Sequence, residues 1–193
     1  LTTDGAGAFD MTNIAGTLLV TDAAAAAADQ VTVADGSSIE LEADLTVELA
    51  YDDGATGDTT ATATVTLGEA STAGGGSEIQ IEETGDTVGT LNIIASANQT
   101  AGDLVLDIET DVAINLSGAG NVDLSNAQIT AGDSTLNASG LSGDLTVTAN
   151  ANLLTITGGS GDDTITAVTA EEFVLDGGAG ADTLNTVADM TSG

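Results

Sequence analysis

Apolar and polar residues alternate along most of the chain with a period of two. In the stretch "QVTVADGSSIELE", Val31 and Val33 are followed by Ile39 and Leu41, and "DLTVELAY" and "SEIQIEE" continue the alternation. A period of two places successive side chains on opposite faces of a β-strand, so each strand is expected to bury one face. We therefore predict an all-β protein. The Asp-Gly pair at residues 35–36 indicates a β-hairpin between the first two runs.

Segments without this alternation are few. The stretch "DAAAAAAD" at residues 22–29 is either a two-turn helix with Asp22 as its N-cap or an alanine-rich connector. Loops are predicted for "YDDGATGD" at residues 51–58 and for "STAGGGS" at residues 71–77.

A short phrase recurs in which glycine and then threonine or aspartate precede an alternating apolar strand. It begins at Gly16, Gly89, Gly102 and Gly143. From residue 111 onward the chain divides into rungs of strand, glycine-containing corner and strand: "INLSGAGNVDLS", "LNASGLSGDLTVT", "LTITGGSGDDTIT" and "FVLDGGAGADTLN". Repeats that bury their apolar faces only against their neighbours indicate stacked coils.

The spacing of the corner glycines suggests the length of one coil. Gly158 follows Gly140 by 18 residues, and Gly177 follows Gly158 by 19 residues. A period near this length is typical of a parallel β-solenoid. We predict that residues 101–193 form such a solenoid. Residues 1–100 form a β-rich region that is either an antiparallel, sandwich-like sheet or an irregular solenoid continuous with the rest.

The charge of the chain is of one sign. Its 193 residues include 31 acidic side chains, no lysine, arginine, histidine or cysteine, and only 2% aromatic residues, which gives a formal charge of -31. Every carboxylate must be solvated, bonded to a backbone N–H group or paired with a bound cation. Such a field repels phosphates, which argues against nucleic acid and anionic membranes as partners. No apolar run is long enough for membrane insertion.

The missing side chains also narrow the possible chemistry. Without histidine, cysteine and lysine, the chain has no Ser-His-Asp triad, thiolate nucleophile, Schiff base or usual zinc site. A carboxylate pair remains possible, but among 31 acidic residues some lie close together by chance. We therefore do not expect an enzyme.

Two stretches near the C-terminus share one motif. "GGSGDDTIT" at residues 158–166 and "GGAGADTLN" at residues 177–185 both match Gly-Gly-x-Gly-x-Asp-x-apolar-x. This nonapeptide is the calcium-binding repeat of RTX proteins. The chain resembles the RTX, or hemolysin-type, repeat family, and within it Gram-negative surface-layer proteins. The nonapeptides cover residues 158–185, and the looser rung pattern covers residues 111–185.

The resemblance implies a β-roll that binds Ca²⁺, in a protein that is secreted and located at the cell surface. Glycine lets backbone carbonyls turn toward an ion, and calcium accepts six to eight oxygen ligands. The implied metal ligands are the carboxylates and nearby carbonyls of Gly158, Ser160, Asp162, Asp163, Gly177, Ala179 and Asp182.

Other positions in the motif carry further expectations. Ile165 and Leu184, at position eight, are expected to point into the core. Leu145 stands at the aspartate position of the preceding rung, so we expect one or two ions rather than a filled ladder. The alternative is that both loops are plain tight turns. A dinucleotide loop is disfavoured because no helix follows. The acidic loop at residues 51–58 is either another calcium loop or a solvated turn.

Three functions fit these features. The first is a structural extracellular protein that self-assembles with calcium into a surface layer or filament. The alternative is a rigid, calcium-binding stalk module of a large secreted RTX adhesin. The third is the repeat region of an RTX enzyme, with the catalytic domain outside these residues because histidine is absent.

Overall fold

The fold is a stack of parallel strands. The structure is a computed structural model of the chain, and it describes residues 8–10, 17–20, 29–33, 36–41, 46–51, 61–70, 77–81, 88–100, 104–108, 111–130, 133–168 and 173–186. These residues form eighteen strands and no helix. All the strand pairings among them are parallel.

The strands belong to three sheets. Sheet A has six strands in the order β1 (Ala8–Asp10), β3 (Asp29–Val33), β5 (Thr46–Tyr51), β7 (Ser77–Ile81), β9 (Leu104–Ile108) and β12 (Gln128–Ile129). Sheet B has eight strands in the order β17 (Val174–Asp176), β15 (Leu153–Thr157), β13 (Ser134–Leu141), β10 (Ala113–Gly118), β8 (Val88–Ala95), β6 (Ala61–Leu67), β4 (Ser37–Leu41) and β2 (Thr17–Val20). Sheet C has four strands in the order β11 (Val122–Leu124), β14 (Leu145–Ala149), β16 (Thr164–Ala167) and β18 (Thr183–Thr186).

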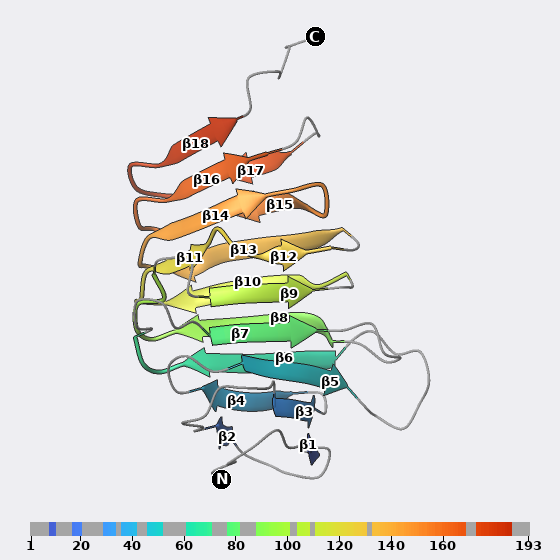
Figure 1. The fold of residues 1–193 in the computed structure, drawn as a ribbon. Helices are drawn as coiled ribbons and strands as arrows, with labels where there is room; N and C mark the ends of the chain where they lie inside the picture. The colour runs from blue at the N-terminus through green and yellow to red at the C-terminus, as the bar shows by residue number, and fades with distance from the viewer. Residues whose placement is uncertain are drawn as a thin grey trace.

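Consecutive strands always lie in different sheets, so the chain winds as a coil. Up to β10 it alternates between sheets A and B, and β11 then adds sheet C to the coil. The last strands, β13 to β18, alternate between sheets B and C. Figure 1 shows the coils stacked in chain order from the N-terminal to the C-terminal end. The predicted parallel β-solenoid is therefore confirmed, and sheet B runs along it from β2 to β17.

The N-terminal part follows the solenoid interpretation rather than the sandwich. The predicted hairpin at residues 35–36 is wrong, because β3 belongs to sheet A and β4 to sheet B. Gly36 instead lies at a change of sheet, with a backbone φ of 78° that favours glycine. The alanine-rich stretch lies outside the described residues except for Asp29, which begins β3. The predicted loops at residues 52–58 and 71–76 also lie outside them.

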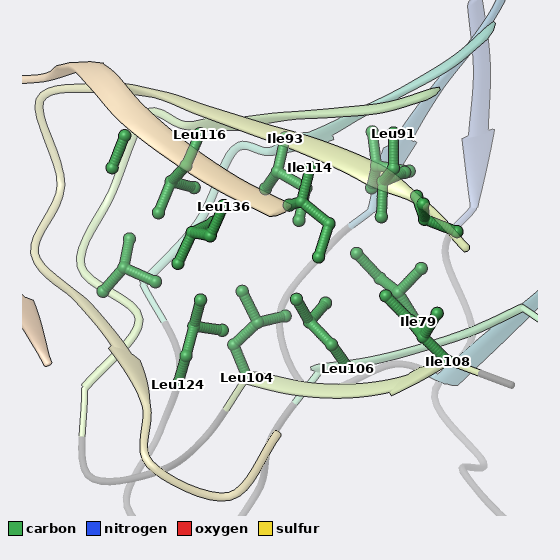
Figure 2. Packing of buried hydrophobic residues seen from close by; sticks show 14 of the residues in the cluster. Ile79, Leu91, Ile93, Leu104, Leu106, Ile108, Ile114, Leu116, Leu124 and Leu136 are labelled. Carbon is green, nitrogen blue, oxygen red and sulfur yellow. The ribbon is translucent and has the colours of Figure 1, made fainter. Parts of the chain in front are cut away.

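A narrow aliphatic core fills the interior between the sheets. Strand β6 shows the alternation clearly, since Ala61, Ala63, Val65 and Leu67 are buried and the threonines between them are partly exposed. Figure 2 shows two facing rows of side chains: Leu91, Ile93, Ile114, Leu116 and Leu136 from sheet B, and Ile79, Leu104, Leu106, Ile108 and Leu124 from sheets A and C. Fully burying one such side chain stabilises the fold by about 1.5–3 kcal/mol.

The coils differ in length, and one predicted step is wrong. Thr157 pairs with Asp176, which confirms the step of 19 residues between the two glycine loops. Gly140, however, pairs with Ser117, and Thr157 pairs with Asn137, so Gly158 does not stack on Gly140. The reason is a register shift in β10 and β13 between Asn115 and Ser117.

Candidate functional site

The two glycine loops stack directly on each other at the corner between sheets B and C. The first loop, residues 158–163, connects β15 to β16, and the second, residues 177–182, connects β17 to β18. Their flanking strands pair in register, with Thr157 opposite Asp176 and Thr164 opposite Thr183. The repeated motif therefore occupies equivalent positions in two neighbouring coils.

Glycine is required at this corner because the backbones approach closely. A Cβ atom on Gly158 would collide with the carbonyl oxygen of Gly177 and with Oδ2 of Asp163. A Cβ atom on Gly177 would collide with the carboxylate of Asp182. The space that side chains would fill is thus lined by one carbonyl and two carboxylates from both loops. These are hard oxygen donors of the kind that Ca²⁺ prefers, so the residues fit the ion.

The Asp163 carboxylate is the most buried charge in the described part of the chain. The residue is 1% exposed. Its Oδ1 accepts a hydrogen bond from the backbone N–H of Leu145 at 2.8 Å, and its Oδ2 accepts one from Gly159 at 2.7 Å. Each oxygen keeps a second lone pair. Asp163 therefore ties its own loop together and fastens it to the coil below.

Burial raises the pKa of Asp163 above its ordinary value. The two backbone hydrogen bonds oppose this shift by stabilising the charged form, whereas the nearby carboxylates of Asp182 and Asp144 add to it. A divalent ion at this corner would remove the repulsion between the carboxylates.

Asp182 occupies the same motif position but has fewer partners. Its Oδ1 accepts a hydrogen bond from the backbone N–H of Asp163 at 3.0 Å, and the residue is half-buried. The N–H of Gly178 donates to Oδ1 of Asp176 at 3.0 Å, whereas the equivalent Gly159 donates to Asp163. The two aspartates are therefore unequal, because only Asp163 closes its loop.

The other predicted ligands lie on the exposed side of the corner. Ser160 and Ala179 are exposed, and their backbone N–H groups donate to Leu141 at 3.0 Å and to Gly159 at 2.9 Å. Asp162 is also exposed. The structure thus brings Gly158, Asp163, Gly177 and Asp182 together. Within the described residues, no three carboxylates are grouped closely enough to hold a metal by themselves, so backbone carbonyls would have to complete the ligand set.

A ladder of side chains that the sequence interpretation missed runs along the same corner. Oδ1 of Asn98 accepts from the N–H of Asn121 at 2.9 Å, and Oδ1 of Asn121 accepts from Asp144 at 3.0 Å. Oδ1 of Asp144 then accepts from Asp162, and that of Asp162 from Ala181, both at 2.8 Å.

Steps of 23, 23, 18 and 19 residues separate the rungs of this Asn/Asp ladder. A signal was present in the sequence: asparagine or aspartate directly follows the corner glycine in Gly120-Asn121, Gly143-Asp144 and Gly161-Asp162. The ladder places Asp162 in a structural hydrogen bond, on the exposed side of the corner.

The remaining motif positions agree with the sequence in part. Leu145 lies in register below Asp163, as its place in the preceding rung predicts, and it is buried. Ile165 is buried, as expected for position eight. Leu184 pairs with Ile165 in register but is 49% exposed, because β18 is the last described strand of sheet C.

Comparisons with known proteins add no family to this picture. No protein-family model, curated protein or solved structure matches the chain. In the part of the chain that the structure describes, no helix has the length and apolar character needed to cross a membrane.

The raised pKa of Asp163 predicts a specific pH dependence. Because the folded state holds this proton more tightly than the unfolded state, its contribution to stability is largest below the ordinary aspartate pKa and is lost as pH rises through the folded-state pKa. In chelator, the melting temperature is expected to rise as the pH is lowered from about 7.5 to about 4.5.

Weakening of general repulsion among the carboxylates acts in the same direction, so the comparison is with Asp163→Asn. This variant should show a shallower rise in melting temperature, measured by circular dichroism. Equal slopes for the two proteins would show that Asp163 does not contribute.

Proposed function

We propose that this chain is a structural extracellular protein that self-assembles into a surface layer or filament and is stabilised by calcium. The observation that carries the proposal is the stacked glycine corner, where a carbonyl and two carboxylates from successive coils line one space. Its match to the RTX nonapeptide, the charge of -31 and the missing catalytic side chains support the same function.

Calcium is the cofactor that this chemistry favours. The chain has no basic side chain to offset the Asp163 and Asp182 carboxylates, and a doubly charged cation would do so at the corner. Asp182 has one carboxylate oxygen without a backbone N–H partner in the described residues, which leaves it available to an ion. Screening of like charges by calcium would also reduce the repulsion that opposes contact between copies.

Calcium titration tests the stabilising role. Extracellular calcium modules have dissociation constants of about 0.1–1 mM. One site at roughly ten times its dissociation constant adds about 1.4 kcal/mol. For a chain of this size we expect the melting temperature to rise by about 3–6 °C. Magnesium at the same concentration is the control, because it loses its water shell reluctantly.

Assembly requires its own measurement. Electron microscopy of the purified chain in calcium is expected to show sheets or filaments, and in chelator dispersed particles. A monodisperse monomer in both conditions would contradict self-assembly. No melting shift with calcium would contradict the metal site.

A second candidate is the rigid stalk module of a secreted RTX adhesin. The feature that favours it is the C-terminal end of the solenoid, where Val174 is 63% exposed and Leu184 49% exposed. Apolar side chains at the end of a solenoid are typically covered by a further coil or cap. Isolated straight rods in calcium, without lateral contacts, would favour the stalk over the surface layer.

A further inference from the structure

The outward face of sheet B carries no carboxylate over five consecutive strands, although the chain has 31 acidic residues. This neutral face is formed by outward-facing side chains of β6, β8, β10, β13 and β15, which lie in register. Its members are Thr62, Thr64, Thr66, Thr90, Asn92, Ile94, Ala113, Asn115, Ser117, Thr135, Asn137, Thr155 and Thr157. They alternate with buried core residues along each strand.

Carboxylates border the neutral face at both ends. Glu40 of β4 pairs with Thr66 below it, and Asp176 of β17 pairs with Thr157 above it. The other faces are different among the described residues. Sheet A presents Glu78 and Asp107 outward, and sheet C presents Asp123 and has only four strands.

From this distribution of charge we infer that the neutral face of sheet B is where a second copy of the chain docks, face to face. The inference rests on the proposed self-assembly and names its surface. Copies that carry a charge of -31 repel each other wherever carboxylates meet. The neutral face lets two copies approach with uncharged side chains in contact, so repulsion opposes association there least.

The side chains of this face are suited to such a contact. Threonine, serine and asparagine are short, so little rotamer freedom is lost when they are covered. Some are already held in place, since Nδ2 of Asn115 donates to Oδ1 of Asn92 at 3.0 Å and Oγ of Ser117 donates to the carbonyl of Ile93 at 3.4 Å. In a two-fold contact, Asn115 on the middle strand lies next to its own copy.

The size of the face predicts a weak contact. Five strands about 4.8 Å apart and three outward positions along each strand give roughly 400 Å² per copy. A standard stable interface buries about 800 Å² on each partner. The pair is therefore expected to form at high local concentration or within a lattice, where several contacts act together.

The test is sedimentation of the full chain in calcium, with one charge added at a time. Asn115→Asp and Thr135→Asp each place a carboxylate on the neutral face. Gln128→Glu adds the same charge on sheet A beside Asp107 and serves as the matched control. The two face variants should weaken self-association at least tenfold, and the control should leave it unchanged. Circular dichroism verifies that each variant is folded.

A charge-pairing experiment separates docking from other effects. Asn115→Lys and Asn115→Asp should each associate weakly alone, and an equimolar mixture should regain association. If the wild type assembles but the face variants assemble equally well, another surface is used and only this inference fails. If the wild type remains monomeric in calcium, both the docking surface and the proposed self-assembly are wrong.

Discussion

Replacing Asp163 with alanine is expected to lower the free energy of unfolding in chelator by about 2–5 kcal/mol. The substitution removes the acceptor for two buried donors, the N–H groups of Leu145 and Gly159. Each buried donor left without a partner costs about 1–3 kcal/mol. Denaturant unfolding followed by circular dichroism measures the change. Asp163→Asn should lose less, because its amide retains one acceptor oxygen.

Asp182→Ala is the matched control for this effect. Asp182 has the same place in the motif, but its carboxylate accepts from only one backbone N–H, that of Asp163. Its loss in chelator should be about 1 kcal/mol. If the two alanine variants unfold at the same denaturant concentration, the two-bond role assigned to Asp163 is wrong. In calcium both variants should lose the stabilisation that the ion provides.

The second large effect is expected at Gly143, where alanine should destabilise the solenoid by about 3 kcal/mol or more. A Cβ atom at this position would collide with the carbonyl group of Gly120 and lie 2.8 Å from the backbone nitrogen of Asn121. All of these contacts are backbone atoms of the coil below, so no side chain can move aside. The two coils would have to separate, which would weaken the hydrogen bond between Asn121 and Asp144.

Ser142→Ala provides the comparison for Gly143→Ala. Ser142 is the preceding residue, is exposed and donates one hydrogen bond from Oγ to the carbonyl of Gly118 at 3.2 Å. Its replacement should change stability by no more than about 1 kcal/mol. Similar melting temperatures for the two variants would mean that the coils can separate locally without penalty. Because Gly143 lies outside both RTX-type loops, calcium should not rescue its variant.

These effects divide the solenoid into two parts. The coils from Asn98 to Asp144 are joined at the corner by the Asn/Asp ladder, which needs no ion. The last two coils add the Asp163 and Asp182 carboxylates, which repel each other. The stabilisation expected from calcium should therefore be concentrated between residues 158 and 182, where hydrogen exchange would show increased protection.

The sequence predicted the strands and their buried faces well. The alternation of Ile79 and Ile81, and later of Leu91 and Ile93, identified side chains that are all buried. Alternation depends only on the two-residue period of an extended chain, so it can be read without knowing a strand's neighbours. The glycine motif likewise predicted that residues 158–163 and 177–182 occupy equivalent corners one coil apart.

The sequence did not predict which strands are neighbours. The pair Asp35-Gly36 would indicate a hairpin in most β proteins, yet β3 and β4 lie in different sheets. A local turn signal cannot distinguish a reversal within one sheet from a step between two sheets. That choice depends on contacts with coils about twenty residues away in sequence.

What the amino-acid sequence determined by itself was local: extended strands with one apolar face, tight corners at the glycines, and a charge that only an external cation can offset. The tertiary structure decided what those corners contain. It placed Asp163 over Leu145, so that a carboxylate is bonded to the backbone of the coil below, and it aligned Asn98, Asn121, Asp144 and Asp162 in one ladder. The reason is physical: register between coils is set by closure of the whole turn, and unequal coil lengths hide it from the sequence.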